Sequence, residues 1–385
     1  ISSTPVIVRN GSNSATIYLV AATEPAPYSF HTKLHALDLG TGRDMIKAAE
    51  IDPAAEIKGG ATISFDPQNQ WNRPGLAYND RNLYVGIGSH CDHAAEDISG
   101  WLLDYDGADL KPAAKFHTIE TPASYELASI WMSGFAPAID SSGNVFAVTG
   151  NGAFAPGTRD WGQSVLRLPP DLQKVQSHFT PAKYQNLNAH DLDFGSGGVM
   201  LLPVVQGQMA PPMAVAMGKS AVLYLLSQTH LGGLKTGDRG VLQWLSLRKY
   251  GQGVWGGPAY YGSPNGGLVY VQIDGDVLRG FSVATGSQPS LKQVAEGTSP
   301  AGRGGSLPIV SSNGSEADTG VVWLIRRGAT VQLEAYDAVA LGNPIFAANA
   351  GTWSKPGGNA FITPLEANGR VYVAAYKTVT VFGLG

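Results

Sequence analysis

Short apolar segments, separated by turns, recur along the whole chain. Each of six segments is opened by a proline: Pro5, Pro74, Pro137, Pro258, Pro308 and Pro364. The long interval between Pro137 and Pro258 contains a further apolar segment, residues 195–202, without a leading proline. Self-similarity of this kind is typical of repeat architectures, in which every copy is one structural unit.

The same two strand patterns follow each apolar segment. After a turn rich in Asn, Asp and Gly comes a β-branched or aromatic strand, at 17–20, 83–86, 145–148, 213–216, 268–271, 321–324 and 371–373. A third strand follows at 34–38, 101–105, 164–168, 222–225, 277–281, 333–337 and 378–382. Because consecutive strands joined by short polar turns form hairpins, the sequence predicts seven copies of a three-stranded antiparallel core.

A weaker fourth strand is expected after turns such as Thr41-Gly42 and Thr285-Gly286. Four antiparallel strands per repeat predict an all-β fold, a β-propeller formed by a single domain over residues 1–385. The blades are placed at about 1–52, 60–119, 130–184, 191–247, 251–298, 302–353 and 358–385. No helix of ordinary length is expected, only short helical turns near 122–127 and 181–187.

The last blade has no fourth strand of its own in the printed sequence. We expect sequence preceding Ile1 to supply it. The alternative is a strand from a neighbouring molecule, which would make the chain a subunit of an extracellular assembly.

Composition narrows the function classes. Hydrophobic residues make up 43% of the chain, enough for a sizeable core, and the net charge of −4 gives no basic footprint for nucleic acid. The strongest apolar run, 199–205, is too short for a membrane span and contains Pro203. Cys91 is the only cysteine, so no intramolecular disulfide can form. Low charge combined with many Tyr and Trp residues favours a secreted or periplasmic protein.

The stretch Leu34-His35-Ala36-Leu37-Asp38-Leu39-Gly40-Thr41-Gly42 resembles the PQQ-like (pyrroloquinoline-quinone-type) β-propeller repeat family. Further segments, at 88–90, 140–146, 149–152, 162–166, 179–181, 193–199 and 379–384, are similar to a bacterial, secreted and mostly uncharacterised branch of that family. The resemblance implies a parent of eight blades, of which seven are visible.

The family name also implies a quinone cofactor. Its large dehydrogenases carry a disulfide between adjacent cysteines and a Ca²⁺ held by Glu, Asn and Asp oxygens. This chain has one cysteine and no local run of residues typical of a calcium loop. We therefore expect no cofactor, with PQQ and Ca²⁺ as the alternative.

Loops at one edge of the blades are the expected place for a site, because alternating strands bring the loop before each first strand and the loop after each second strand together. The ligand-binding candidates there are Arg73, Trp131, Asp193, Lys219, Trp255 and Arg303. The cations suit a carboxylate or sulfate, and the tryptophans suit a sugar ring or a planar group. In the structural alternative, the tryptophans pack between blades and the arginines bind backbone carbonyls.

Catalytic and metal chemistry have fewer candidates. His190 beside Asp191 and Asp193 could form an oriented general base, but no nucleophile is identifiable. No metal site is expected, since consecutive loop residues rarely wrap one ion; otherwise His90, Cys91 and His93 are the candidate ligands.

The sequence thus favours an exported, non-redox propeller rather than an enzyme. Its expected partner is a small anionic ligand, a glycan or a protein. A PQQ-dependent dehydrogenase that oxidises alcohols or sugars is the alternative.

Overall fold

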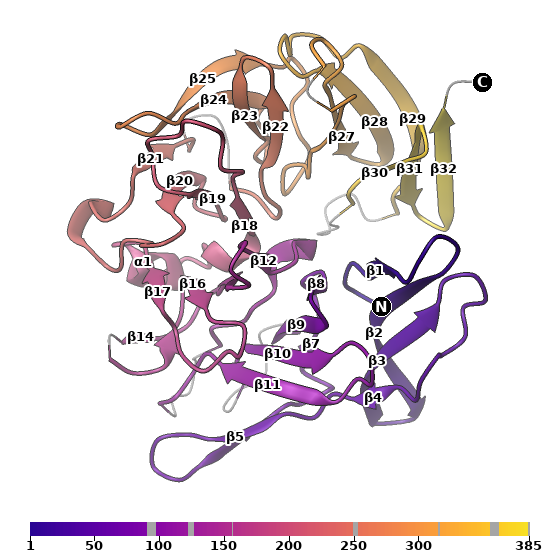
Figure 1. The fold of residues 1–385 in the computed structure, drawn as a ribbon, viewed down its shortest axis with the longest axis vertical. Coiled ribbons are helices and arrows are strands. Elements are labelled where there is room, and N and C mark those ends of the chain that lie inside the picture. Colours follow the sequence, from indigo (N-terminus) through magenta and orange to yellow (C-terminus); the bar gives the residue numbers. More distant parts are fainter. Residues whose placement is uncertain are drawn as a thin grey trace. The chain divides into compact units, whose positions relative to one another are not determined.

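The computed structural model describes residues 1–90, 98–121, 127–155, 157–248, 253–314, 316–354 and 362–383. The chain divides into two compact units: unit 1 (Ile1–Val199 and His230–Gly240) and unit 2 (Met200–Thr229 and Val241–Gly385). In the described residues the fold is an all-β propeller of seven antiparallel blades, so the predicted fold class is confirmed. The strands of each blade lie side by side in Figure 1.

Unit 1 contains the first three blades. Blade 1 consists of β1 (Val6–Arg9), β2 (Ala15–Ala26), β3 (Ser29–Asp38) and β4 (Ala49–Glu50). Blade 2 consists of β7 (Gln70–Trp71), β8 (Ala77–Asn79), β9 (Asn82–Ser89), β10 (Trp101–Asp106) and β11 (Pro112–His117). Blade 3 consists of β12 (Ala138–Ile139), β13 (Val145–Val148), β16 (Val165–Leu168) and β17 (Ser177–Phe179).

Unit 2 contains the remaining blades, apart from the first residue of β18. Blade 4 consists of β18 (Val199–Leu201), β19 (Met213–Ala216), β20 (Val222–Ser227) and β21 (Gln243–Ser246). Blade 5 consists of β22 (Ala259–Ser263), β23 (Gly266–Val271), β24 (Arg279–Ala284) and β25 (Ser290–Glu296). Blade 6 consists of β26 (Ile309–Ser311), β27 (Val321–Arg327), β28 (Thr330–Asp337) and β29 (Phe346–Thr352). Blade 7 consists of β30 (Leu365–Ala367), β31 (Arg370–Ala375) and β32 (Thr378–Gly383).

Helices are few and short in the described part of the chain. They are α1 (Tyr184–Ala189) and the 3-10 turns η1 (Met132–Gly134), η2 (Phe194–Ser196) and η3 (Thr236–Asp238). The helical turn expected near 181–187 corresponds to α1, while most of the one expected near 122–127 lies outside the described residues. None of the described helices has the length and apolar character needed to cross a membrane.

Two short hairpins lie outside the repeat pattern. They are β5 (Ala54–Glu56) with β6 (Thr62–Ser64), and β14 (Phe154–Ala155) with β15 (Asp160–Trp161). Blade 2 also departs from the pattern, because its first strand is split into β7 and β8, both paired with β9. Pro74 lies between the two pieces and cannot donate a ladder hydrogen bond. The Asn72 amide bonds the carbonyls of Pro74 and Gly86 at this break.

Apolar side chains pack blade against blade within each unit. In unit 1, Tyr18 and Leu34 of blade 1 share one buried cluster with Leu83, Val85 and Leu103 of blade 2. This arrangement follows from alternation along each strand, which puts apolar side chains on both faces of a blade that is covered on both sides.

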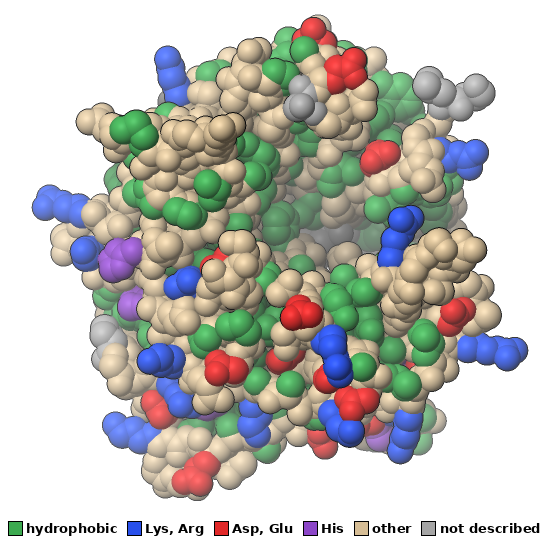
Figure 2. All heavy atoms as spheres, viewed as in Figure 1, with side chains coloured by type: hydrophobic (Ala, Val, Ile, Leu, Met, Phe, Trp, Pro, Cys, Tyr) green, Lys and Arg blue, Asp and Glu red, His purple; other side chains and the backbone are tan. Residues whose placement is uncertain are grey.

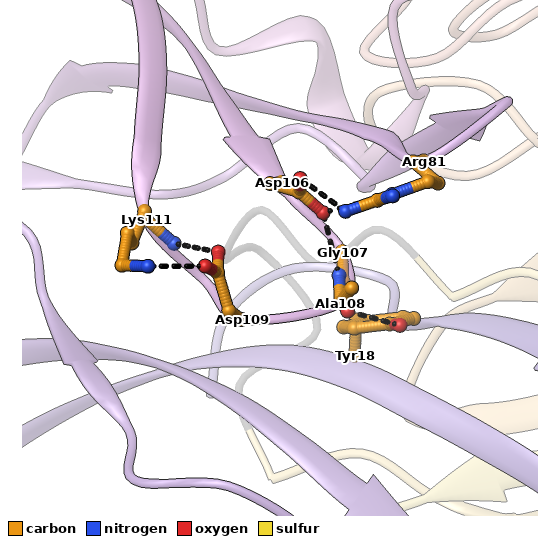
Figure 3. Close-up of polar contacts among 7 residues, drawn as sticks. All are labelled: Tyr18, Arg81, Asp106, Gly107, Ala108, Asp109 and Lys111. Carbon is orange, nitrogen blue, oxygen red and sulfur yellow. Dashed lines mark hydrogen bonds and ion pairs between the residues drawn. The ribbon is translucent and has the colours of Figure 1, made fainter.

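A buried tyrosine on the second strand of a blade ties that blade to the next. The Tyr18 hydroxyl donates to the Gly107 carbonyl at 2.7 Å, in the turn after β10 (Figure 3). The same turn is closed by the Arg81–Asp106 and Lys111–Asp109 ion pairs, both 2.6 Å. Equivalent bonds run from Tyr84 to Pro170 and from Tyr270 to Ala338. Each bond reaches the turn that ends the third strand of the next blade.

Blade 7 has three strands in the described residues. We predicted that a strand from before Ile1, or from a neighbouring molecule, completes this blade, and this stays a prediction. The single domain and the limits of the blades also stay predictions.

Candidate functional site

The candidate residues divide between the two units. Unit 1 contains Arg73, Trp131 and Asp193, and unit 2 contains Lys219, Trp255 and Arg303. On the face shown in Figure 2, charged side chains are scattered among other residues rather than gathered in one large patch. The local geometry therefore has to be followed residue by residue.

In unit 1 the Arg73 guanidinium lies over the Trp131 indole. Its Cζ atom is 5.0 Å from the ring centroid, which is cation–π geometry. Arg73 is in the loop between β7 and β8, and Trp131 directly precedes η1. A side chain at Gly88 of β9 would come within 3.0 Å of the Trp131 Cβ, so this glycine allows the close approach of the two segments.

The backbone after Trp131 is strained. Met132, Ser133 and Gly134 have φ values of 38°, 44° and 89°, three successive residues in the left-handed region. Such residues persist only where the surrounding structure holds them, and they cluster at binding and catalytic sites. Met132 and Ser133 are fully buried, and Ser133 Oγ has no hydrogen-bond partner among the described residues. The strained turn thus fixes the backbone from which the Trp131 side chain projects, and it does so at a conformational cost.

The Asp193 carboxylate adjoins the same indole. A Cβ added at Gly150 would lie 2.5 Å from Asp193 Oδ1 and 3.0 Å from Trp131 Nε1, so both groups meet above this glycine. Asp193 is buried, and its Oδ1 accepts the Asn151 backbone N–H at 2.8 Å. The three candidates of unit 1 are therefore brought together, with Trp131 in the middle.

A network of side-chain amides supports this carboxylate. Gln163 Nε2 donates to Asn151 Oδ1 at 2.7 Å and to Asn188 Oδ1 at 2.9 Å. Gln163 Oε1 accepts the Phe194 N–H at 2.7 Å, directly after Asp193. Gln163 is fully buried with a φ of 53°. Sequence reasoning missed the role of Gln163 and Asn188; the one available signal was an amide directly after Gly162, ahead of an apolar strand.

His190 does not form the expected pair with an aspartate. Its Nδ1 lies 2.9 Å from the Asn186 carbonyl oxygen, one turn back in α1, and the ring is exposed. Asp191 Oδ1 instead accepts from Asn151 Nδ2 at 2.9 Å. The physical reason is that His190 follows the last residue of α1, where the final carbonyls of a helix seek donors.

The metal candidates are only partly described. The His90 ring stacks on Trp71, with centroids 3.6 Å apart and planes inclined by 12°. Cys91 and His93 lie outside the described residues. Within the described ranges, no three His, Cys, Asp or Glu side chains are grouped closely enough to hold a metal ion.

In unit 2 the loops gather around Trp255. Lys219 Nζ lies 6.0 Å from the Trp255 ring centroid. The Trp255 backbone N–H donates to the Gly304 carbonyl at 3.0 Å, and a Cβ added at Gly304 would lie 3.0 Å from the indole and 3.7 Å from an Arg327 nitrogen. Because Gly304 has no side chain, the Trp255 ring and the Arg327 guanidinium can both occupy the space where a Cβ would stand.

Cations outnumber anions in this cluster. The Arg327 guanidinium donates to the Arg303 carbonyl and is buried, with 6% of its surface exposed. Burial and the nearby charge of Arg303 lower the pKa of Arg327, while Asp274 acts in the opposite direction. Lys219 and Arg327 thus lie near one indole, and the charge of Arg303 acts on Arg327. Arg327, the last residue of β27, was not among the six predicted ligand-binding residues.

Comparisons with known proteins support the fold. No protein-family model matches the chain, and no curated protein matches it. The quinohemoprotein alcohol dehydrogenase ADHIIG from Pseudomonas putida HK5 matches 94% of this chain with a TM-score of 0.54 and 12% identity. The quinohemoprotein alcohol dehydrogenase from Comamonas testosteroni matches 93% with a TM-score of 0.53 and 14% identity. The match covers 61% of each of those chains. The likeness shows a propeller fold of the quinoprotein type.

Two features of the chain depart from the quinone site that the family resemblance implies. With Cys91 as the single cysteine, a disulfide between adjacent cysteines cannot form. Asp191 and Asp193 both accept hydrogen bonds from Asn151, so Asn151 presents donors to them rather than joining them as an oxygen ligand.

Proposed function

We propose that this protein is an exported, non-redox propeller that binds a small anionic ligand through loops carrying cation–indole pairs. The observation that carries the proposal is the repetition of one arrangement in both units: Arg73 over Trp131, and Lys219 over Trp255. A cation that lies on an aromatic face is held in one orientation, and so are its remaining N–H groups. A bound anion accepts charge-assisted hydrogen bonds from these N–H groups.

The unit 2 cluster has the charge balance that an anion requires. Among the described residues linked to this cluster, the cations Lys219, Arg303 and Arg327 outnumber the carboxylate of Asp274, which acts on Arg327. Burial, and then the charge of Arg303, lower the pKa of Arg327, and a bound anion would offset both effects. A carboxylate or sulfate is the expected class, and the Trp255 ring adds an apolar surface for a planar or sugar-like body.

Binding of sulfate, citrate and glucuronate, measured by isothermal titration calorimetry, tests the proposal. Arg303→Gln and Lys219→Gln should each weaken binding about tenfold, the loss of one charge-assisted hydrogen bond. Lys292→Gln is the matched control, because Lys292 is exposed in β25 and the charge change is the same. If these two variants and Arg73→Gln all bind the anions as the wild type does, the proposal is wrong.

Arg73→Gln tests unit 1 separately. Arg239→Gln is its control, because Arg239 is exposed and lies in the same unit. Loss of binding in Arg73→Gln with no change in Arg239→Gln would assign the ligand to the Trp131 loops.

A PQQ-dependent dehydrogenase is the second candidate, favoured by the buried Asp193 carboxylate beside an indole. Asp193 would then serve as the base that accepts the proton of an alcohol or sugar hydroxyl. Adding PQQ and Ca²⁺ and following absorbance and dye-linked oxidation of alcohols separates the candidates. A bound chromophore with activity that is lost in Asp193→Asn would replace the proposal above.

A further inference from the structure

Unit 1 also contains a cleft that none of the ligand-binding candidates lines. Its volume is about 400 Å³, near the lower end of the range for small-molecule sites. It is lined by Ala22, Thr23, Glu24, Phe30, Pro67, Gln68, Asn69, Trp71 and His90. The lining comes from the outer ends of β2 and β3 on one side, and from the turn before β7 and the end of β9 on the other.

An aromatic plane is fixed at one wall of the cleft. The Trp71 indole is backed by the His90 ring, which lies parallel to it at 3.6 Å. Trp71 pairs with Gly88 in the sheet, and the His90 N–H donates to the Asn69 carbonyl at 2.7 Å. The indole therefore needs no reordering to receive a ligand, which lowers the entropic cost of binding.

The turn beside Trp71 is rigid and presents amides. The Asp66 carboxylate accepts the Gln68 N–H at 2.9 Å and Asn69 Nδ2 at 2.7 Å. The Asp66 N–H in turn donates to Gln70 Oε1 at 2.8 Å. With the backbone held in this way, the exposed Gln68 carboxamide has no partner in the described part of the chain and is available to a ligand.

The opposite wall adds one carboxylate and a second ring. Glu24 is exposed at the end of β2, and its Oε1 accepts the Tyr28 N–H at 3.0 Å. Phe30 of β3 supplies the ring. Among the described residues, the lining contains one carboxylate and neither Lys nor Arg, so it offers an anion no permanent positive charge.

We infer that this cleft binds one neutral sugar residue of a glycan. A pyranose has an apolar C–H face that packs on an indole, and hydroxyls around its edge that exchange hydrogen bonds with amides and donate to a carboxylate. Trp71 supplies the packing surface, Gln68 the carboxamide and Glu24 the acceptor. An aromatic ring beside a carboxylate could also bind an organic cation. Such a ligand would leave the N–H donors of the Gln68 carboxamide unused.

The experiment uses the whole chain and a panel of neutral disaccharides: maltose, cellobiose, lactose and diacetylchitobiose. Saturation-transfer NMR and calorimetry should detect saturable binding of at least one, with a Kd on the order of 1 mM. Trp71→Ala should weaken it at least about tenfold, and Gln68→Ala and Glu24→Gln several-fold. Trp244→Ala is the matched control, because this indole is 48% exposed in β21, outside the cleft.

Gln68→Ala keeps the test valid if Trp71→Ala fails to fold, because Gln68 is exposed and its side chain makes no contact that holds the turn. The inference is wrong if no disaccharide of the panel binds, or if binding is unchanged in Trp71→Ala and Gln68→Ala. It is also wrong if choline or arginine binds in place of the sugars with the same dependence on Trp71 and Glu24.

Discussion

Asp104 should make the stability of the protein fall as the pH rises towards neutrality. It lies in the middle of β10, paired with Tyr84 on one side and Ala114 on the other, and is 3% exposed. Its Oδ1 has no hydrogen-bond partner in the described residues. Burial, above all, and then the charge of Asp106 raise the pKa of Asp104 to about 7, against the lowering effect of backbone hydrogen bonds at Leu83 and Tyr105.

The magnitude follows from the two pKa values. A carboxyl with a pKa of about 7 in the folded protein and about 3.9 in the unfolded chain binds its proton more tightly when folded. The free energy of unfolding is therefore highest below about pH 4 for this group, and falls by up to about 4 kcal/mol as the pH rises through about 7. The buried His117 and the half-buried His178 act oppositely, because desolvation lowers their pKa values and their contribution is lost as the pH falls.

Asp104→Asn isolates the effect, since the amide matches the shape of the protonated acid and carries no charge. Urea unfolding, followed by tryptophan fluorescence between about pH 4 and pH 8, should give similar midpoints for variant and wild type at the acid end. At the alkaline end the variant should have the higher midpoint. Asp109→Asn is the control: this exposed carboxyl has its pKa lowered by Lys111, so its removal should not stabilise the protein at alkaline pH. Parallel pH profiles for Asp104→Asn and the wild type would refute the reasoning.

Two further substitutions test the packing between and within blades. Tyr270→Phe removes the buried 2.6 Å hydrogen bond to the Ala338 carbonyl and should cost about 1–2 kcal/mol of unfolding free energy, whereas Tyr28→Phe, at an 87% exposed position, should leave the urea midpoint unchanged. Equal midpoints for the two variants would show that this hydrogen bond between blades contributes nothing to the free energy of unfolding. Asp276→Asn leaves the buried Arg279 without the carboxylate that now contacts it at 2.6 and 2.8 Å, and should cost about 3 kcal/mol in the same assay. A neutral result there would mean that the remaining contacts of Arg279, Glu296 among them, compensate the guanidinium.

The strands could be predicted because their signal is local. The predicted strands 145–148 and 213–216 have the same first and last residues as β13 and β19. A short apolar run bounded by turn residues is typical of a buried strand, so its ends are visible in the sequence. The split of the first strand of blade 2 could not be foreseen. It depends on the Asn72 amide reaching the Gly86 carbonyl on another strand, a contact that no local pattern encodes.

The candidate site was predictable in residue type but not in geometry. Alternating strands place Arg73 and Trp131 in loops at the same edge, yet the cation–π contact between them depends on the left-handed turn at Met132 and Ser133. Non-glycine residues give no sequence signal for such a turn. The amide network around Gln163 joins residues from three segments, so it becomes visible only after folding.

The most direct measurement of the central claim is anomalous diffraction from crystals soaked in selenate, a sulfate-like anion with a strong scatterer. The proposed function predicts a peak within hydrogen-bond reach of the Lys219, Arg303 and Arg327 side chains beside Trp255, and its disappearance in Arg303→Gln crystals. Selenate bound only elsewhere on the protein, with that cluster unoccupied at saturating concentration, would contradict it.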